Sequence, residues 1–140
     1  MAMMDRVDAL RRLTGSLSAR LATVRPDSTP HVVPIVFAVV GSDVVTMIDH
    51  KPKTTQNLQR LRNLEANPRA SVLADHYAED WHQLWWVRAD GDARVISDGP
   101  EHERAAAALA EKYSQYWDRP PTGPAIIIPM EHVSWWASSV

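Results

Sequence analysis

Cysteine is absent from this sequence, as are the short motifs of several large enzyme classes. Without cysteine, the chain cannot contain a disulfide framework, a thiolate metal site or a cysteine nucleophile. No GxSxG, GxGxxG or P-loop pattern occurs, so the usual hydrolase, Rossmann and nucleoside-triphosphatase readings have no support. The six histidines form neither an i,i+4 pair on a helix nor an HExxH motif, and we therefore expect no metal site.

Long apolar runs and a strong excess of one charge are also missing. No run approaches the ~20 apolar residues of a membrane span. The N-terminus lacks the basic start and apolar block of a signal peptide. The net charge is only −2, which indicates no nucleic-acid or anionic-membrane partner. We therefore expect a cytoplasmic protein, folded as a single domain over residues 1–140.

The hydrophobic pattern predicts a mainly β chain with three inserted helices. Apolar residues at helical spacing indicate helices within segments 3–13, 54–68 and 99–117. The other segments alternate or are rich in β-branched residues, and turn sequences separate them, which predicts antiparallel strands. This order favours an α+β class: a barrel-like domain of mainly antiparallel strands with short peripheral helices.

Some strand details carry specific expectations. The run His31–Val40 is apolar on both faces, which predicts a strand covered on both sides. Pro34 within it indicates a sheet edge or a bulge, because proline lacks the N–H that a ladder needs. Asp90-Gly91 is either a hairpin turn or a glycine bulge inside one long strand. The final apolar segment is either a strand pair or one strand bent at Pro129.

The stretch DHKPKTTQNL joins a predicted strand to a predicted helix and is basic. Four basic residues and no acidic one occur between positions 51 and 64: Lys51, Lys53, Arg60 and Arg62. The free N–H groups of a helix start, together with ammonium groups and the Thr54 hydroxyl, suit a phosphate or a carboxylate. The alternative is a solvated basic loop. Cations at a helix N-terminus are unfavourable unless an anion offsets them, which favours the anion site.

Tryptophan is abundant, with six residues that include the adjacent pairs Trp85-Trp86 and Trp135-Trp136. Neighbours in a strand point to opposite faces, so each pair should place one ring inward and one outward. An outward tryptophan is explained by a partner subunit or a planar ligand. Packing in the core and in a dimer is the alternative explanation.

The chain resembles the pyridoxamine 5′-phosphate oxidase-like split β-barrel proteins. The stretches that carry the resemblance are ARLATVRPDSTPHVVPIVFAV, VVTMIDHKPKTTQNLQRLRNLEANPRASVL, VRADGDARVI and IIIPMEHVSWW. The most specific part is the K-x-K-T-x-x-N-L block with a later N-P, placed after a strand. The chain looks most like the F420-dependent (deazaflavin) oxidoreductases of the B type. The resemblance implies a six- to seven-stranded split β-barrel in which Asp90-Gly91 is a bulge within a long strand.

The resemblance also implies a homodimer with cofactor sites in grooves between the subunits. It implies that Lys51, Lys53 and Thr54 bind the phosphate or acidic tail of coenzyme F420. The cofactor ring is expected against two strands, at Pro34, Ile35, Val36, Thr46, Met47 and Ile48, with Arg20 reaching the same groove from the neighbouring strand. Aromatic residues from the later strands of the other subunit close the groove, and the candidates are Trp85, Trp86, Trp135 and Trp136.

The implied activity is hydride transfer between reduced deazaflavin and an unsaturated, conjugated small-molecule acceptor. The second arginine-lysine set of the true pyridoxamine phosphate oxidases is not seen, which argues against vitamin B6 oxidation. Arg20, Arg88 and His76 are candidates to polarise an acceptor oxygen, and the sequence does not choose among them. An FMN-binding oxidoreductase of the same fold and a non-catalytic cofactor-binding protein are the alternatives.

Overall fold

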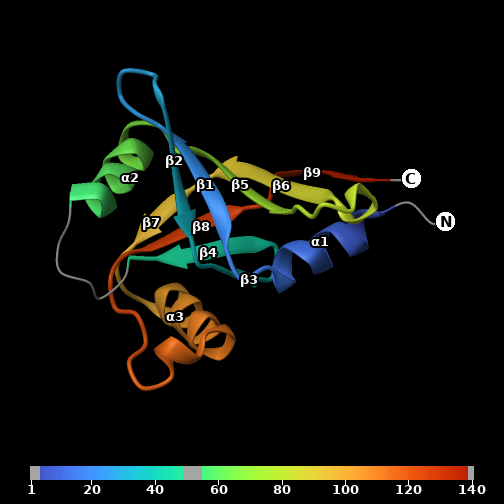
Figure 1. Ribbon diagram of the computed structural model, residues 1–140. Coiled ribbons are helices and arrows are strands. Elements are labelled where there is room, and N and C mark those ends of the chain that lie inside the picture. The colour runs from blue at the N-terminus through green and yellow to red at the C-terminus, as the bar shows by residue number, and fades with distance from the viewer. Residues whose placement is uncertain (1–3, 49–54, 139–140) are drawn as a thin grey trace.

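The computed structural model describes residues 4–48 and 55–138, with side chains from residue 59 onward in the second range. These residues form three α-helices, two short 3-10 helices and nine strands (Figure 1). The helices are α1 (Arg6–Gly15), α2 (Thr55–Ala66) and α3 (Pro100–Lys112), with η1 (Trp81–Gln83) and η2 (Ser114–Tyr116). The strands are β1 (Ala19–Val24), β2 (Pro30–Ile35), β3 (Ala38–Val40), β4 (Asp43–Met47), β5 (Arg69–His76), β6 (Trp85–Asp92), β7 (Arg94–Ile96), β8 (Ala125–Pro129) and β9 (His132–Ala137). Among the described residues, no helix is long and apolar enough to cross a membrane.

The strands form two antiparallel sheets. The large sheet has the order β2-β1-β5-β6-β9, and the small sheet has the order β3-β4-β8-β7. Three pairs of strands, β2–β3, β6–β7 and β8–β9, follow each other with at most two residues between them, and each pair runs from one sheet to the other. The nine strands are therefore six continuous extended stretches. This architecture confirms the predicted α+β class with mainly antiparallel strands.

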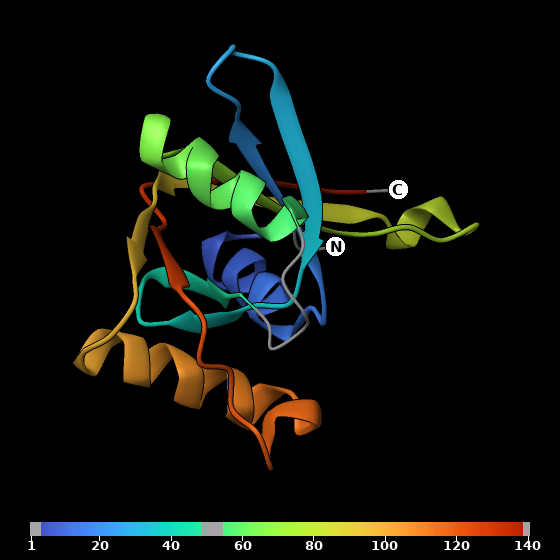
Figure 2. The same ribbon diagram turned by 90° about the vertical axis from the view of Figure 1, so that its left-hand side faces the viewer.

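The buried apolar residues form two clusters, and the larger one contains residues of both sheets, such as Val72 of β5 and Val44 of β4. Ala9 and Leu13 of α1 are fully buried against the inner face of the large sheet, where Leu21 and Val72 are also fully buried. α1 begins at an Asp5–Asp8 capping box, which satisfies free N–H groups of its first turn. α3 packs on the small sheet through a second cluster. Figure 2 shows α3 on the opposite side of the molecule from the β1–β2 hairpin.

The strand β2 lies at the edge of the large sheet, which confirms the edge alternative for Pro34. The prediction that His31–Val40 is one strand covered on both sides is wrong. The run is divided between β2 and β3, which belong to different sheets. Val32 is 60% exposed, and Pro34 is exposed as well. An apolar outward face on an edge strand has the same sequence pattern as a strand buried on both sides.

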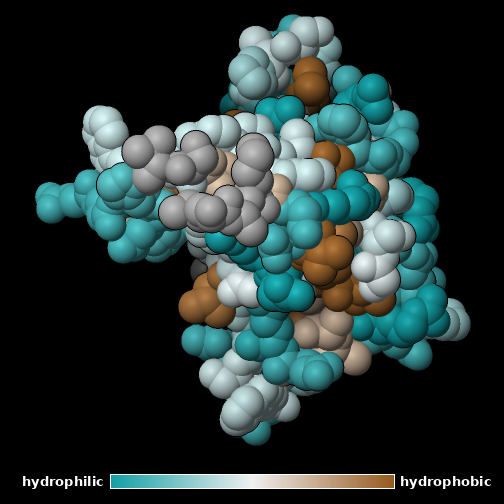
Figure 3. All heavy atoms as spheres, turned by 90° about the vertical axis from the view of Figure 1, so that its right-hand side faces the viewer, coloured by the Kyte–Doolittle hydropathy of each residue, from teal (hydrophilic) through white to brown (hydrophobic). Residues whose placement is uncertain are grey.

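The outer face of the large sheet is the face opposite the core. Strand alternation places Ala22, Leu73, Trp86, Arg88 and Trp136 on it, in addition to Val32 and Pro34. The helices α1 and α2 contribute their buried leucines to the core on the inner face. The outer face keeps solvent-exposed apolar groups, such as Trp136 at 46% exposure. Figure 3 shows a further gathering of apolar atoms on the side of the molecule where both termini lie.

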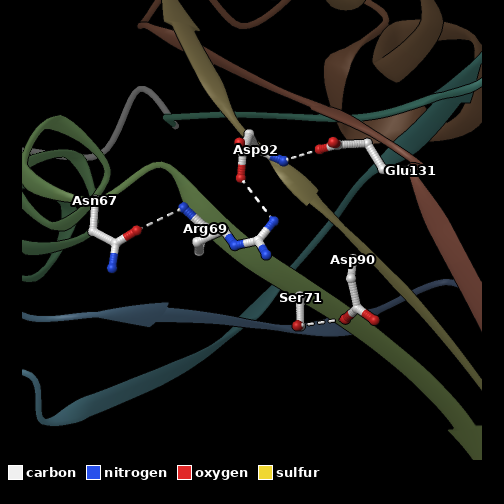
Figure 4. Close-up of polar contacts among 6 residues, drawn as sticks. All are labelled: Asn67, Arg69, Ser71, Asp90, Asp92 and Glu131. Carbon is white, nitrogen blue, oxygen red and sulfur yellow. Dashed lines mark hydrogen bonds and ion pairs between the residues drawn. The ribbon is translucent and has the colours of Figure 1, made fainter.

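Asp90-Gly91 lies within β6, so the single long strand is confirmed and the hairpin is wrong. The expected bulge is not found in the ladder with β5, where Asp90, Gly91 and Asp92 each pair with one residue. A Cβ atom at Gly91 would lie 1.9 Å from the carbonyl oxygen of Pro129. Glycine is therefore required by the close approach of the β8–β9 connection. The backbone N–H of Asp92 donates to the Glu131 carboxylate (Figure 4). The Glu131 N–H donates to the Asp90 carbonyl over 3.0 Å. These contacts fix the place where two chain stretches pass between the sheets.

Candidate functional site

The two segments predicted to hold a cofactor ring lie side by side, although they belong to different sheets. The Thr46 hydroxyl of β4 donates to the Val36 carbonyl oxygen over 2.8 Å. The Ile48 N–H donates to the Pro124 carbonyl over 3.0 Å, which ties the end of β4 to the loop before β8. The fold therefore brings residues 34–36 and 46–48 together.

The side chains of these two segments differ in what they offer a ligand. Ile35 and Met47 are buried in the two apolar cores, and Thr46 is buried as well. A ligand can meet these three residues only through their backbone. Pro34 and Val36 are exposed, and Ile48 is half-buried. We call the surface formed by Pro34, Val36 and Ile48 the ring wall.

Arg20 lies next to the ring wall. It pairs with Pro34 in the register of β1 and β2, and both side chains are exposed. A guanidinium at this position can bind a ring oxygen or an acidic group of a molecule that rests on Pro34. The predicted association of Arg20 with the second strand therefore has a geometric basis in the large sheet.

The backbone just after the ring wall is held by α3. The Lys112 ammonium donates to the Phe37 carbonyl over 2.9 Å and lies 3.9 Å from the centre of the Phe37 ring. The Tyr113 hydroxyl accepts from the Phe37 N–H over 3.1 Å and lies 2.9 Å from the Leu17 carbonyl oxygen. Burial lowers the pKa of Lys112 to about 8. These contacts fix the crossing from β2 to β3 and with it the position of Val36.

The predicted anion-binding residues Lys51, Lys53 and Thr54 lie outside the described residues, so their role stays a prediction. Three basic side chains lie near α2, the helix that follows this segment. They are Arg25 of the β1–β2 turn, His31 of β2 and Arg60 of α2 itself, and we call them the cationic cluster. The pKa of His31 is lowered by burial and by the charges of Arg25 and Arg60.

Two atoms of the cationic cluster are buried without a partner. Arg60 Nε and His31 Nδ1 form no hydrogen bond within residues 4–48 and 59–138. Burial also lowers the pKa of Arg60, and no carboxylate of the described residues offsets this effect. Leaving a charged donor buried and unpaired is costly, so proteins usually pair such groups. The cluster therefore has the chemistry of a site that an anion completes.

A buried polar contact seats α2 at this end of the barrel. The Asn63 amide, fully buried, donates to the Thr23 hydroxyl of β1 over 3.0 Å and accepts from Gln59 Nε2 over 2.7 Å. His31 lies directly opposite Thr23 in the register of β1 and β2. Arg60 is therefore brought to His31 by strand pairing and helix docking. The sequence showed Arg60 as part of a basic run, but it contained no local signal for Arg25 or His31.

The four paired tryptophans divide as predicted, with one ring of each pair inward. Trp85 and Trp135 pack against the core of the large sheet. Trp135 Nε1 donates to the Met4 carbonyl over 3.0 Å, and the Arg12 guanidinium lies 5.4 Å from the centre of the Trp85 ring. These contacts make Trp85 and Trp135 part of the packing beneath α1.

Trp86 and Trp136 point to the outer face, where they oppose each other across β6 and β9. They line a groove of about 420 Å³, which we call the outer groove. Its lining residues are Leu73, Asp75, His76, Tyr77, Leu84, Trp85, Trp86, Arg88 and Trp136. The Arg88 guanidinium lies 5.6 Å from the centre of the Trp86 ring. The groove is mainly apolar, with one guanidinium and one carboxylate.

The ring wall and the outer tryptophans are far apart within one chain. Pro34 lies on β2 and Trp136 on β9, at opposite edges of the large sheet. Four steps between neighbouring strands, of about 4.8 Å each, separate these edges by about 19 Å. A single chain therefore does not bring together all the residues predicted for the cofactor site. Within the described residues, no group of three or more metal-ligating side chains occurs.

Comparison with known proteins gives a family match and a set of similar structures. The sequence matches the family described as pyridoxamine 5′-phosphate oxidase over residues 5–136. No curated protein sequence matches the chain. The conserved hypothetical protein Rv2991 from Mycobacterium tuberculosis superposes with a TM-score of 0.79 at 19% identity, covering 97% of this chain and 86% of that one.

Two further structures have binding properties in their descriptions. A FAD-binding protein from Mesorhizobium loti superposes with a TM-score of 0.71 at 22% identity, covering 96% of this chain and 95% of that one. A FAD and heme binding protein from Mycobacterium smegmatis has a TM-score of 0.72 at 18% identity, covering 97% and 72% of the two chains. At such identities the likeness concerns the fold alone, and it confirms the predicted split β-barrel.

Proposed function

Since this chain belongs to the pyridoxamine 5′-phosphate oxidase family, we propose that it is an oxidoreductase that binds coenzyme F420 and transfers a hydride to an unsaturated, conjugated acceptor. The observation that carries the proposal is the cationic cluster, in which Arg60 Nε and His31 Nδ1 are buried and have no hydrogen-bond partner among the described residues. The cluster lies at the helix that follows the basic segment 51–54. A cofactor with several negative charges fits this place better than one with a single phosphate.

The charge of the ligand favours a deazaflavin over FMN. Lys51 and Lys53 precede α2, and the cationic cluster adds two guanidinium groups and one imidazole near it. FMN has one phosphate, whereas F420 has a phosphate and an acidic tail, so only F420 supplies anions for both groups. A charge-assisted hydrogen bond contributes roughly 1.5–3 kcal/mol. Two or three such bonds suffice for strong discrimination between the cofactors.

The residues of this chain would position the cofactor and exclude water. Pro34 and Val36 offer an apolar wall for a planar ring, and Arg20 offers a charged group beside it. Lys112 and Tyr113 hold the backbone behind Val36. When bound and reduced, the cofactor supplies the hydride, and the proton that completes the reduction comes from solvent or a side chain. The protein contributes orientation and a dry slot.

The site also needs a second subunit. The outer face exposes Val32 and Trp136, and exposed apolar surfaces of this kind mark interfaces. We propose a homodimer in which Trp86 and Trp136 of the partner subunit cover the ring wall. This arrangement accounts for the separation of about 19 Å between the two halves of the site, estimated from four strand spacings.

Val32→Asp should shift the protein from dimer to monomer, because it places a carboxylate in the apolar outer face. Sedimentation or light scattering across a concentration series measures the shift. Val7→Asp is a matched control, since Val7 is 62% exposed but lies on α1, and it should leave the mass unchanged. A wild-type protein that is monomeric at high concentration would contradict the proposed dimer.

Lys53→Ala should weaken F420 binding by about 10- to 100-fold, the loss of one charge-assisted bond. Binding is followed by quenching of tryptophan fluorescence on titration with oxidised and reduced F420. Arg11→Ala is the control, because Arg11 is an exposed residue of α1 paired with Asp8. Equal F420 affinity of wild type and Lys53→Ala would rule out the anchoring role.

The same titration with FMN, FAD and haem separates the alternatives. The likeness to proteins described as FAD-binding and as FAD and heme binding supports including these ligands. Tighter binding of FMN or FAD than of F420 would assign the chain to flavin chemistry. Cofactor binding without reduction of any acceptor, in a broad screen of conjugated compounds, would identify a non-catalytic binding protein.

A further inference from the structure

We propose that the outer groove is the acceptor site and that it selects planar, conjugated acceptors with a single carboxylate, which Arg88 binds. This inference rests on the proposed function, because it names the substrate class of the same site. The evidence is the apolar lining, the arrangement of Arg88 and the position of one opposing carboxylate.

The lining of the groove suits a flat hydrophobic molecule. Trp86 and Trp136 present their rings side by side on β6 and β9, and Leu73 and Leu84 contribute aliphatic surface. Indole rings stack on planar conjugated systems and bury a large apolar area. A volume of about 420 Å³ lies within the range of small-molecule pockets. The groove therefore has room for a molecule of two or three fused rings.

Arg88 lies beside a carboxylate of its own strand. Its Nε lies 3.5 Å from Asp90 Oδ1, and that oxygen also accepts from the Ser71 hydroxyl over 2.6 Å. Figure 4 shows Ser71 and Asp90 facing each other on β5 and β6. The terminal nitrogens of Arg88 have no hydrogen bond to any side chain described in the structure. With Nε turned toward Asp90, those nitrogens remain available as a fork that matches a carboxylate.

The structure also distinguishes Arg88 from the other two residues considered for this role. Arg20 lies beside Pro34 on β1, three strands away from Trp136 of β9 in the large sheet. The His76 ring stacks on Trp85, with the ring centres 6.3 Å apart and the planes at 20°. His76 also lines the outer groove, but the stacking on Trp85 occupies one face of its ring. Arg88 is the candidate that combines a free donor fork with an aromatic wall.

Asp75 limits the number of negative charges that a ligand of the outer groove can carry. It lines the groove and lies opposite Trp86 in the register of β5 and β6. Arg88 is paired with Leu73, two positions along the same strand from Asp75. A ligand carboxylate next to Arg88 is therefore attracted, and a second carboxylate near Asp75 is repelled. The groove should prefer an acceptor with one acidic end over a diacid.

The test uses 2-naphthoate as a probe and 2-naphthamide as its neutral isostere, titrated against the protein without cofactor. Tryptophan fluorescence or calorimetry measures both affinities. Wild type should bind naphthoate at least 10-fold more tightly than naphthamide. Arg88→Gln should remove this preference and leave naphthamide binding within about 2-fold. Trp136→Leu should weaken both probes, since it removes the stacking surface that they share.

Arg69→Gln is the matched control, because Arg69 is an exposed arginine on β5 that pairs with Asp92 outside the outer groove. It should leave both affinities unchanged. Equal binding of the two probes by wild type, or an unchanged preference in Arg88→Gln, would overturn the acceptor-site inference. The outcome does not depend on F420, so failure of F420 to bind would overturn the proposed function separately.

Discussion

Gly91→Ala is expected to destabilise the protein by roughly 3–5 kcal/mol or to prevent folding, the largest stability effect we anticipate for any single methyl group. The new Cβ would lie 1.9 Å from the Pro129 carbonyl oxygen and 3.1 Å from Glu131 Oε2. Relief requires a backbone shift, because Pro129 belongs to β8 and pairs with Asp43 of β4. Overpacking against a paired strand is therefore relieved only by breaking ladder hydrogen bonds.

Urea unfolding followed by tryptophan fluorescence measures this change. Gly15→Ala is the control, because a Cβ at Gly15 meets no atom within 4 Å and the residue ends α1. Alanine is favoured over glycine in a helix, so this variant should be neutral or stabilised by up to about 1 kcal/mol. If both variants have the same urea midpoint of unfolding as the wild type, the close approach of Pro129 does not constrain Gly91.

Arg60→Met should change stability and ligand binding in opposite directions. The apo protein should become more stable or stay unchanged, because the substitution removes a half-buried charge whose Nε has no partner and keeps an apolar side chain of similar length. Binding of F420 should weaken by about 10- to 100-fold, since one charge-assisted contact to its anionic part is lost. A residue retained at a cost to stability is typical of a binding site.

Thermal unfolding and F420 titration of the same preparation separate the two effects. Arg62→Met is the control: Arg62 is exposed on the same helix and donates to Gln59 over 2.8 Å. It should change neither quantity by a measurable amount, because exposed polar contacts contribute little. Loss of stability in Arg60→Met with unchanged F420 affinity would identify Arg60 as a structural residue and remove the main support for the anion site.

Much of the fold follows from local patterns in the sequence. Strand alternation predicted the division of each tryptophan pair, and the helical spacing predicted all three helices. The error concerned residues 31–40, where apolar residues occur on both faces. This pattern is shared by a central strand and by an edge strand whose outer face is exposed in the isolated chain. Only the order of the strands, which depends on distant segments, distinguishes the two.

The candidate site was less predictable than the fold, for a physical reason. Thr46 and Met47 were expected as ring contacts, but their side chains are buried, because the sequence does not show which face of β4 meets α3. His31 and Arg25 gave no signal, since they approach Arg60 only after β1 pairs with β2 and Asn63 docks on Thr23. Charges brought together by tertiary contacts cannot be recognised from spacing alone.

The three chain stretches that pass between the sheets have a consequence for cooperativity. β2–β3, β6–β7 and β8–β9 each contribute to both sheets, so loss of one sheet withdraws support from three strands of the other. Partial unfolding that spares one sheet is therefore unfavourable. Hydrogen exchange of the backbone amides should show this. The amide of Val72, in the large sheet, and that of Ile127, in the small sheet, should have the same opening free energy.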